Sequence, residues 1–139
     1  MPDNQKLEVS TTVEAPQDKA WKAYTSADAI PKWNFASDDW CCPTAKVDLK
    51  VGGNHSARME AKDGSVGFDF NGKYEEVDAP HALTLILEDG RRSRTTFEAA
   101  GARTTVRTIF DADSEAPVEM QQSGWQSILD NFRRYVEST

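Results

Sequence analysis

Hydrophobic and polar residues alternate near the start of the chain, in the stretch KLEVSTTVEA at residues 6–15. Leu7, Val9 and Val13 occupy every second position together with Thr11, and glutamate or hydroxyl side chains lie between them. Side chains at every second residue share one face of a β-strand. The pattern therefore predicts a strand with one buried face and one solvated face.

The spacing changes after Pro16. Within residues 15–33 the apolar side chains recur at helical intervals, at Ala20, Trp21 and Tyr24. A proline fits the first turn of a helix, because the N–H groups of that turn have no partner within the helix. Ser26 and Asp28 are suited to cap a second short helix, which Pro31 disturbs. We therefore expect two short helices after the first strand.

The middle of the chain returns to strand-like patterns separated by turn signals. The dipeptide Asp-Gly occurs at residues 63–64 and 89–90, and such a pair between alternating segments indicates a hairpin. Short connections favour pairing of consecutive strands in an up-and-down order. The strands predicted in this way are residues 45–51, 54–61, 66–77, 83–88, 93–99 and 103–112.

The last part of the chain, residues 116–138, has one apolar stripe at helical spacing. The stripe consists of Val118, Trp125, Ile128, Leu129, Phe132 and Val136. Pro117 fits the first turn, and Ser114 or Asp113 fits the cap. Gly124 costs about 1 kcal/mol relative to alanine within a helix, so we expect another backbone to approach it closely.

These elements together predict the fold class α+β. A curved antiparallel sheet of about six to seven strands wrapped around the long C-terminal helix would bury both the helix stripe and the inner face of the sheet. Such an arrangement leaves room for a cavity between the helix and the sheet. The length and the absence of a linker or repeat favour one domain over residues 1–139.

Charge and hydropathy exclude two classes of partner. The chain has 16 basic and 23 acidic residues, a net charge of -7, and nucleic-acid binding requires clustered positive charge. The basic cluster Arg91–Arg94 is interpreted as a solvated strand start or an anion contact. The chain lacks a long apolar run or a secretory signal, so we expect no membrane insertion and a cytoplasmic location.

The stretch KWNFASDDWCCP at residues 32–43 carries the residues that could do chemistry. Cys41 and Cys42 are the only cysteines, and neighbouring cysteines rarely join to each other, so reduced thiols are expected. With two histidines elsewhere and no Cys-x-x-Cys pair, a metal site is not expected, and no cofactor is implied. Asp38 and Asp39 could form an acid–base pair or a turn, and adjacent side chains usually point apart.

Several short motifs occur in a specific order: Val13 with Pro16, AWKAYT at 20–25, Trp33, VGG at 51–53, DG at 63–64, GKYEEV at 72–77 and GWQSILDNF at 124–132. In this combination the chain resembles the SRPBCC, or START-like (Bet v-like helix-grip), superfamily. Within it, the chain is similar to the bacterial single-domain group related to the C-terminal domain of the activator of the heat-shock-protein-90 ATPase. The stretch WNFASDDWCCP looks like a signature of one branch of that group.

The resemblance implies a deep, mostly apolar cavity between the sheet and the C-terminal helix. Trp33, Phe35 and Trp40 would lie at its mouth, and the alternative is that they pack in the core or at the rim, which is as favoured for Trp33. Met120, Trp125 and Leu129 would face the cavity from the last helix. The inward face of strand 66–77 would add further side chains, and two residues would supply polar points. The full set of expected ligand-binding residues is Trp33, Phe35, Trp40, Cys42, His55, Phe68, Phe70, Tyr74, Met120, Trp125 and Leu129.

Three of these residues are candidates for catalysis. Tyr74 and His55 are suited to donate or accept a proton. Cys42 would be a nucleophile only with a base beside it, and His55 is the one base expected nearby; the alternative is a small apolar thiol in the cavity wall. Arg58 and Glu60 share one strand face, which would orient a polar ligand group if it points inward and would be solvated if it points outward.

Two functions of different classes follow. The first is binding of a small hydrophobic or aromatic molecule, with cyclase-type or lyase-type chemistry as an extension. The second is a protein-interaction module like the co-chaperone relatives; a dimeric stress protein without a ligand is a third, and a homodimer is common among relatives. An open cavity above ~300 Å³ would favour the first, and a cavity filled by side chains would exclude it.

Overall fold

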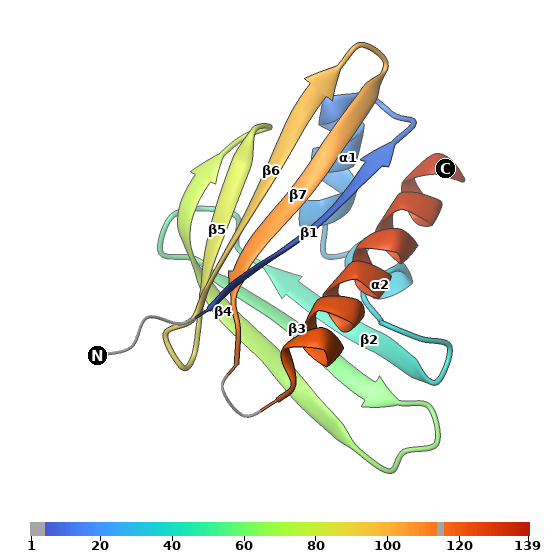
Figure 1. Cartoon of the computed structure of the whole chain (residues 1–139), viewed down its shortest axis with the longest axis vertical. Helices are drawn as coiled ribbons and strands as arrows, with labels where there is room; N and C mark the ends of the chain where they lie inside the picture. The colour runs from blue at the N-terminus through green and yellow to red at the C-terminus, as the bar shows by residue number, and fades with distance from the viewer. Residues whose placement is uncertain (1–4, 114–115) are drawn as a thin grey trace.

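The computed structural model describes residues 5–113 and 116–139. An antiparallel sheet curls around a long C-terminal helix, and a short helix and a turn of 3-10 helix follow the first strand (Figure 1). The elements are β1 (Lys6–Val13), α1 (Gln17–Thr25), η1 (Ile30–Lys32), β2 (Trp40–Val47), β3 (Asn54–Ala61), β4 (Gly67–Asp78), β5 (Ala82–Leu87), β6 (Arg92–Ala100), β7 (Arg103–Asp111) and α2 (Val118–Glu137). The predicted α+β class and helix-grip architecture are confirmed.

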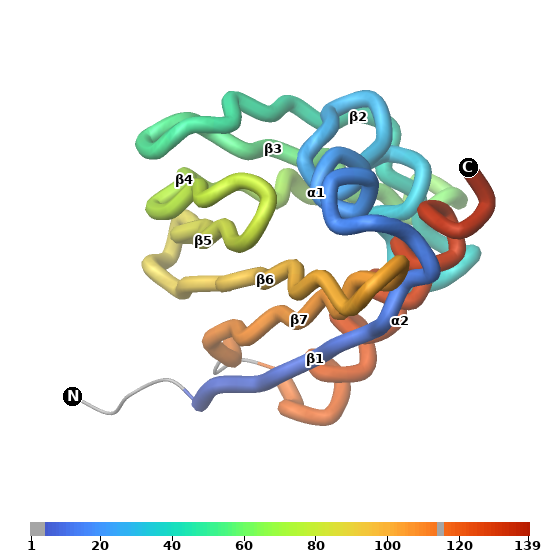
Figure 2. The backbone as a smooth tube through the Cα atoms, turned by 90° about the horizontal axis from the view of Figure 1, so that it is seen from above, coloured from blue at the N-terminus to red at the C-terminus, as the bar shows by residue number. Residues whose placement is uncertain are grey.

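The sheet has seven strands in the order β1-β7-β6-β5-β4-β3-β2. Consecutive strands from β2 to β7 are hairpin neighbours, as the turn signals predict. The chain closes the other edge by pairing β1 with β7, so that Val9 lies opposite Thr108. Figure 2 shows the sheet curling from β1 to β2, with α2 lying along its open side. The inner face of the sheet and α2 therefore enclose the interior.

The buried face of each element agrees with its sequence pattern. Val9 and Val13 on β1 are 3% and 0% exposed, while the residues between them are exposed or half-buried. On α2 the stripe residues Leu129, Phe132 and Val136 are buried. Together with the aromatic side chains of α1 and β6, they form one continuous core. Hydrophobic burial of this kind stabilises the curled sheet against the helix.

The free edge of β1 is covered by polar side chains of α2. The Gln126 amide donates to the Ser10 carbonyl at 2.9 Å, and its oxygen accepts the Ser10 N–H at 3.3 Å. Gln122 donates to the Glu8 carbonyl at 3.1 Å. An exposed strand edge is a template for unwanted pairing, so these amides take the place of a further strand. No periodicity in the sequence indicates this role.

Two β-bulges change which residues face inward. In β2 the register shifts between Cys41 and Thr44, around a proline that lacks a donor for the ladder. In β4 it shifts between Tyr74 and Glu76, so Tyr74 is buried while two successive glutamates reach the outer face. The prediction that β2 begins at residue 45 and runs to 51 was wrong, because the bulge lets pairing begin at Trp40 and end at Val47.

Two predictions for the last helix were also wrong. A side chain at Gly124 would meet no atom of another described element within 4 Å, so none of these elements brings its backbone close to it. The helix begins after Pro117, and no described side chain caps it. Asp113 is instead bound by Gln121, whose Oε1 accepts its N–H at 2.7 Å. The other predicted cap, Ser114, lies outside the described residues. Within those residues, no helix combines the length and apolar character needed to cross a membrane.

Candidate functional site

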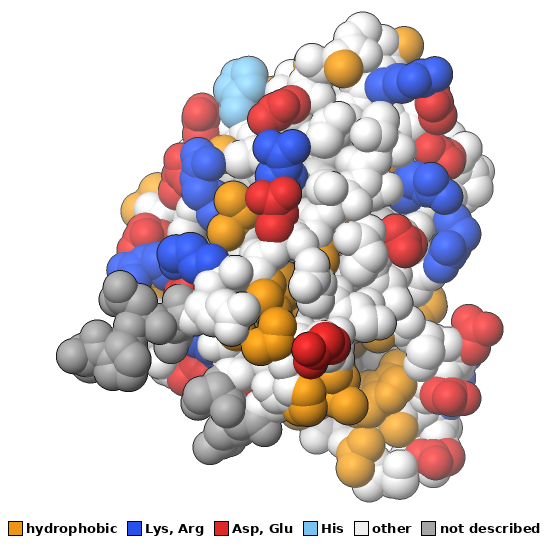
Figure 3. Space-filling view, in the orientation of Figure 1, with side chains coloured by type: hydrophobic (Ala, Val, Ile, Leu, Met, Phe, Trp, Pro, Cys, Tyr) orange, Lys and Arg blue, Asp and Glu red, His pale blue; other side chains and the backbone are white. Residues whose placement is uncertain are grey.

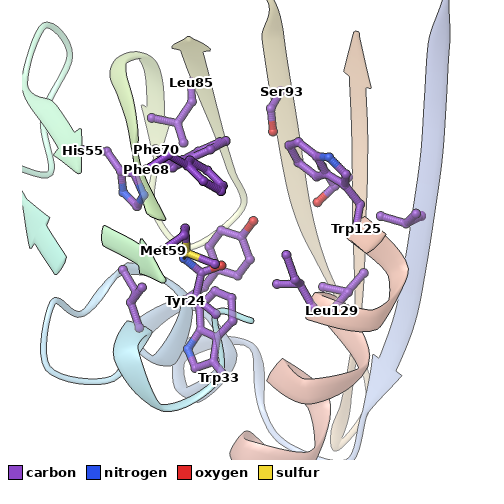
Figure 4. A pocket seen from close by; sticks show the side chains of 15 residues that line it. Tyr24, Trp33, His55, Met59, Phe68, Phe70, Leu85, Ser93, Trp125 and Leu129 are labelled. Carbon is purple, nitrogen blue, oxygen red and sulfur yellow. The ribbon is translucent and has the colours of Figure 1, made fainter. Parts of the chain in front are cut away.

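A cavity of about 140 Å³ lies between the inner face of the sheet and α2. Most of its lining is aromatic or aliphatic, with a few polar side chains (Figure 4). The residues that line it are Val9, Tyr24, Ile30, Trp33, Asn34, His55, Met59, Phe68, Phe70, Leu85, Ser93, Thr108, Trp125, Ile128 and Leu129. A concave apolar site with few polar groups is typical of small-molecule binding.

Stacked aromatic rings hold two sides of the cavity. Trp125 of α2 lies on Phe110 of β7, with ring centroids 4.0 Å apart and planes inclined by 8°. Tyr24 of α1 stacks on Trp33 at 5.2 Å, and the Trp33 indole N–H donates to the Ala23 carbonyl at 3.1 Å. Each ring is therefore supported by a second contact, so its orientation toward the cavity is set by the core.

One side of the cavity carries a histidine–tyrosine pair. His55 Nδ1 and the Tyr74 hydroxyl lie 3.2 Å apart, and Tyr74 is 3% exposed behind the cavity lining. Burial lowers the pKa of His55 to about 4, because the charged imidazolium loses its hydration. Burial also raises the pKa of Tyr74. Both groups are therefore uncharged near neutral pH.

Hydroxyl groups lie on the opposite side of the cavity. The Tyr24 hydroxyl is 3.3 Å from that of Thr95, which is 2.8 Å from the hydroxyl of Thr108. Ser93 lines the same side and lies across the cavity from His55 in Figure 4. The pKa of Tyr24 is raised by burial. The cavity therefore has two polar sides separated by apolar surface.

The structure brings part of the predicted site together. The predicted residues that line the cavity are Trp33, His55, Phe68, Phe70, Trp125 and Leu129. Trp33 is only 4% exposed, so of its two predicted places the core is correct and the mouth is not: it is a buried wall residue. Phe68 is 50% exposed and occupies the rim instead.

The other predicted residues are not among the lining side chains. Trp40 is half-buried, and its ring packs against that of Phe68 with the centroids 6.0 Å apart. Phe35 is also half-buried, and its backbone carbonyl accepts a hydrogen bond from the Asn131 side chain at 2.6 Å. Met120 is 67% exposed, so the prediction that it faces the cavity was wrong. Tyr74 reaches the site only through its hydrogen bond to His55.

Cys42 and His55 do not form a pair. Cys41 lies opposite Glu60 while Val47 lies opposite His55, so Cys42 is displaced from His55 by about four residues, or ~13 Å, along β3. The Cys42 thiol instead lies 3.5 Å from the Thr44 carbonyl, and burial raises its pKa. A buried thiol without a base is a poor nucleophile. The catalytic role considered for Cys42 is therefore not supported by the geometry.

Charged residues lie on the outer face of the sheet. Arg58 contacts Glu60 at 2.9 Å and Asp69 at 3.5 Å, and all three side chains are at least 37% exposed. The outward alternative was therefore correct for Arg58 and Glu60. In the cluster 91–94 each arginine has an acidic partner: Arg91 with Asp89, Arg92 with Glu75 and Arg94 with Glu76.

The remaining acidic and sulfur ligands do not converge. Asp38 and Asp39 lie in an exposed turn, closed by the hydrogen bond from the Trp40 N–H to the Ser37 carbonyl at 3.2 Å. Across residues 5–113 and 116–139, no three His, Cys, Asp or Glu side chains gather as metal ligands.

Several lining residues were not predicted as part of the site. Tyr24 was identified only as a member of a helical stripe, and Ser93 and Thr108 only as strand positions. Leu85 and Met59 lie on inward faces that the strand alternation identifies, and this signal could have found them. Asn34 follows η1, and nothing in its sequence context indicates the cavity.

Apolar side chains gather at the lower end of the molecule in Figure 3, between the start of α2 and the β3–β4 hairpin. The large apolar residues exposed on these segments are Val66 at 56%, Phe68 at 50% and Met120 at 67%. We call these three residues the apolar rim. Because Phe68 also lines the cavity, the apolar rim adjoins the cavity on this side of the molecule.

The curled antiparallel sheet, the long C-terminal helix and the interior cavity define a helix-grip protein. The chain belongs to the family of Activator of Hsp90 ATPase homolog 1-like proteins, whose family model matches residues 14–137. This membership is consistent with the SRPBCC superfamily. No functionally curated protein matches the chain.

Solved structures agree with this assignment. An AHSA1-like protein from Aeromonas hydrophila is 42% identical, with a TM-score of 0.90 over 96% of this chain and 93% of that chain. A protein from Cytophaga hutchinsonii is 40% identical, with a TM-score of 0.80 over 99% of this chain and 94% of that chain. A protein from Chromobacterium violaceum, 18% identical, shares the fold with a TM-score of 0.86 over 96% and 98%.

Proposed function

We propose that the protein binds a small hydrophobic or aromatic molecule in the cavity between the sheet and α2. The observation that carries this proposal is the composition of the cavity: aromatic and aliphatic walls with an uncharged histidine on one side and hydroxyl groups on the other. Apolar walls provide the free energy of binding, and a few fixed polar groups set the orientation.

The size of the cavity limits the ligand. A volume of about 140 Å³ is below the ~300 Å³ that was expected to mark an ordinary ligand site. An apolar cavity of ~150 Å³ nevertheless binds benzene in a well-studied engineered case. We therefore propose a ligand portion the size of one substituted aromatic ring, which stacks among Trp33, Phe70 and Trp125.

The ionisation of the site favours binding over turnover. A general acid or base works best when its pKa is near the operating pH. The pKa of His55 is lowered to about 4 and that of Tyr74 is raised, so neither side chain exchanges protons readily at neutral pH. Cyclase-type or lyase-type chemistry therefore lacks an evident proton carrier, and we propose that the protein is a binding protein.

A thermal-shift titration with toluene and benzaldehyde tests the proposal. A ligand that binds only the folded state raises the melting temperature. We expect a concentration-dependent increase for the wild-type protein and none for Leu85→Phe, in which the larger side chain occupies the cavity. Met120→Ala is the matched control, because Met120 is 67% exposed outside the lining, and it should keep the full shift. No shift in the wild-type protein, or an equal shift in Leu85→Phe, would contradict the proposal.

A second candidate function is a co-chaperone-like protein contact, which the apolar rim favours. The family description names activation of the Hsp90 ATPase, and exposed apolar clusters often mark protein-contact sites. We expect the chain to raise the ATP hydrolysis rate of a purified Hsp90, and Phe68→Gln to reduce this effect. Ile109→Gln is the control, since Ile109 is 42% exposed on the outer face of the sheet. Unchanged hydrolysis with the wild-type protein excludes this function, and equal loss in both variants excludes the apolar rim as the contact surface.

The homodimer expected from the resemblance stays a prediction. Sedimentation velocity of the wild-type protein and of Phe68→Gln would measure it, because the apolar rim is the surface that a second copy would cover.

A further inference from the structure

The histidine–tyrosine pair determines which ring nitrogen of His55 can bind a ligand in the cavity. His55 lines the cavity from β3, and Figure 4 shows its ring at the wall of the cavity. Nδ1 is occupied by the Tyr74 hydroxyl at 3.2 Å. Within the part of the chain that the structure describes, Nε2 has no protein partner. The remaining hydrogen-bonding capacity of His55 is therefore offered to the cavity.

The pairing selects one tautomer of His55. If the Tyr74 hydroxyl donates to Nδ1, its proton has an acceptor and the imidazole proton resides on Nε2. In the reverse arrangement Nδ1–H would donate to the phenol oxygen, and the buried hydroxyl proton would have no acceptor among the described residues. Buried donors are rarely left in that state, and an imidazole nitrogen accepts more strongly than a phenol oxygen. Tyr74 therefore acts as a positioning residue that holds Nε2–H.

We propose that the Nε2–H of His55 selects, among small aromatic molecules, those that carry an uncharged hydrogen-bond acceptor such as an aldehyde or ketone oxygen. This inference rests on the proposed function, because it specifies the ligand class of the same cavity. It requires that the acceptor approach His55 while the ring lies against Phe70 and Trp125, whose ring centroids are 6.3 Å apart.

The lack of positive charge in the cavity disfavours aromatic ligands that carry a carboxylate. Among the described residues, no lysine or arginine lines the cavity, and Arg58 on β3 points to the outer face, where it contacts Glu60. Burial keeps His55 uncharged near neutral pH, since its pKa is lowered to about 4. A carboxylate that entered the cavity would lose its hydration and would find no cationic side chain in the lining to pair with. A ketone or aldehyde loses less hydration free energy than a carboxylate when it enters the cavity, and its oxygen can also accept a hydrogen bond from the His55 Nε2–H.

The tautomer is measured directly by long-range ¹H–¹⁵N correlation of the histidine rings. We expect His55 to carry its proton on Nε2 in the wild-type protein and to lose this preference in Tyr74→Phe. His81 is the internal reference, because it is exposed and its ring Nδ1 lies 3.2 Å from the Gln17 side-chain amide. The variant His81→Gln assigns the signals. A proton on Nδ1 of His55 in the wild-type protein would overturn the inference.

Ligand selection is measured by NMR titration with toluene, benzaldehyde and benzoate at neutral pH. One hydrogen bond should make benzaldehyde bind about three- to tenfold tighter than toluene, and benzoate should bind more weakly than benzaldehyde. His55→Phe should remove the preference for benzaldehyde while it retains toluene binding. Toluene binding without any preference overturns this inference and leaves the proposed function intact. No binding of toluene or benzaldehyde overturns both.

Discussion

At the scale of single residues, burial decides the chemistry that His55 and Cys42 can perform. Both were candidates for catalysis on the basis of side-chain type. Burial moves the pKa of each away from neutral pH in the direction that favours its uncharged form. The two side chains also lie on different parts of β3 and β2, so neither activates the other. Both side chains are therefore uncharged near neutral pH.

The depressed pKa of His55 predicts a dependence of stability on pH. The pKa is 6.5 in the unfolded chain and about 4 in the folded protein, so the unfolded state binds more protons between these values. The contribution of neutral His55 is complete above pH 6.5 and decreases as the pH falls toward 4. Between pH 7.5 and pH 5 the loss should reach up to about 2 kcal/mol.

Urea unfolding at both pH values measures this loss as the difference between the wild-type protein and His55→Phe. The difference removes the contribution of carboxylates such as Asp111, whose pKa is lowered mainly by the Lys6 contact despite its burial. His81→Gln is the matched control, because His81 is exposed. An equal pH dependence in wild-type and His55→Phe would show that burial does not hold His55 neutral.

At the scale of elements, α2 has two separate tasks. Its apolar stripe packs into the sheet, and its amides at Gln122 and Gln126 hydrogen-bond to the edge of β1. The opposite edge strand, β2, is interrupted by a bulge and a proline, which discourages pairing with another strand. Both edges of the sheet are thus protected by different means.

We predict that Gln126→Ala loosens the β1 edge locally. The substitution removes both hydrogen bonds to Ser10, which should cost about 1 kcal/mol and accelerate amide hydrogen exchange at Ser10. Ser123→Ala, an exposed position on the same helix, should leave exchange unchanged. If Ser10 exchanges equally slowly in both variants, the amide of Gln126 does not protect the edge.

At the scale of the whole molecule, the outer face of the sheet is charged and the inner face is apolar. The outer face carries exposed ion pairs such as Arg92–Glu75 and Arg94–Glu76, each worth no more than about 1 kcal/mol. The inner face contains the core and the cavity, and the apolar rim joins the cavity to the surface. Among the described residues, the lining of the cavity includes no Asp, Glu, Lys or Arg side chain, while the chain has a net charge of -7. The ligand binding that we propose therefore depends on apolar contacts and one hydrogen-bond donor.

The accuracy of the sequence-based predictions follows the range of the interactions involved. Strand alternation and helical spacing report local burial, so they identified β1, the hairpin strands and the stripe on α2. They failed at the bulge in β2, where one extra residue reverses the alternation, and at Gly124, where the expected close contact is missing. The site residues were found in part, because a stripe residue such as Tyr24 looks the same whether it faces the core or a cavity.

The sequence by itself determined the class of fold, the acidic net charge and the apolar nature of the interior, since these depend on composition and local periodicity. Only the tertiary structure decided which side chains meet. It separated Cys42 from His55, joined His55 to Tyr74 and buried Trp33 away from the surface. The reason is physical: register shifts and the position of α2 result from long-range packing, which no short stretch of sequence encodes.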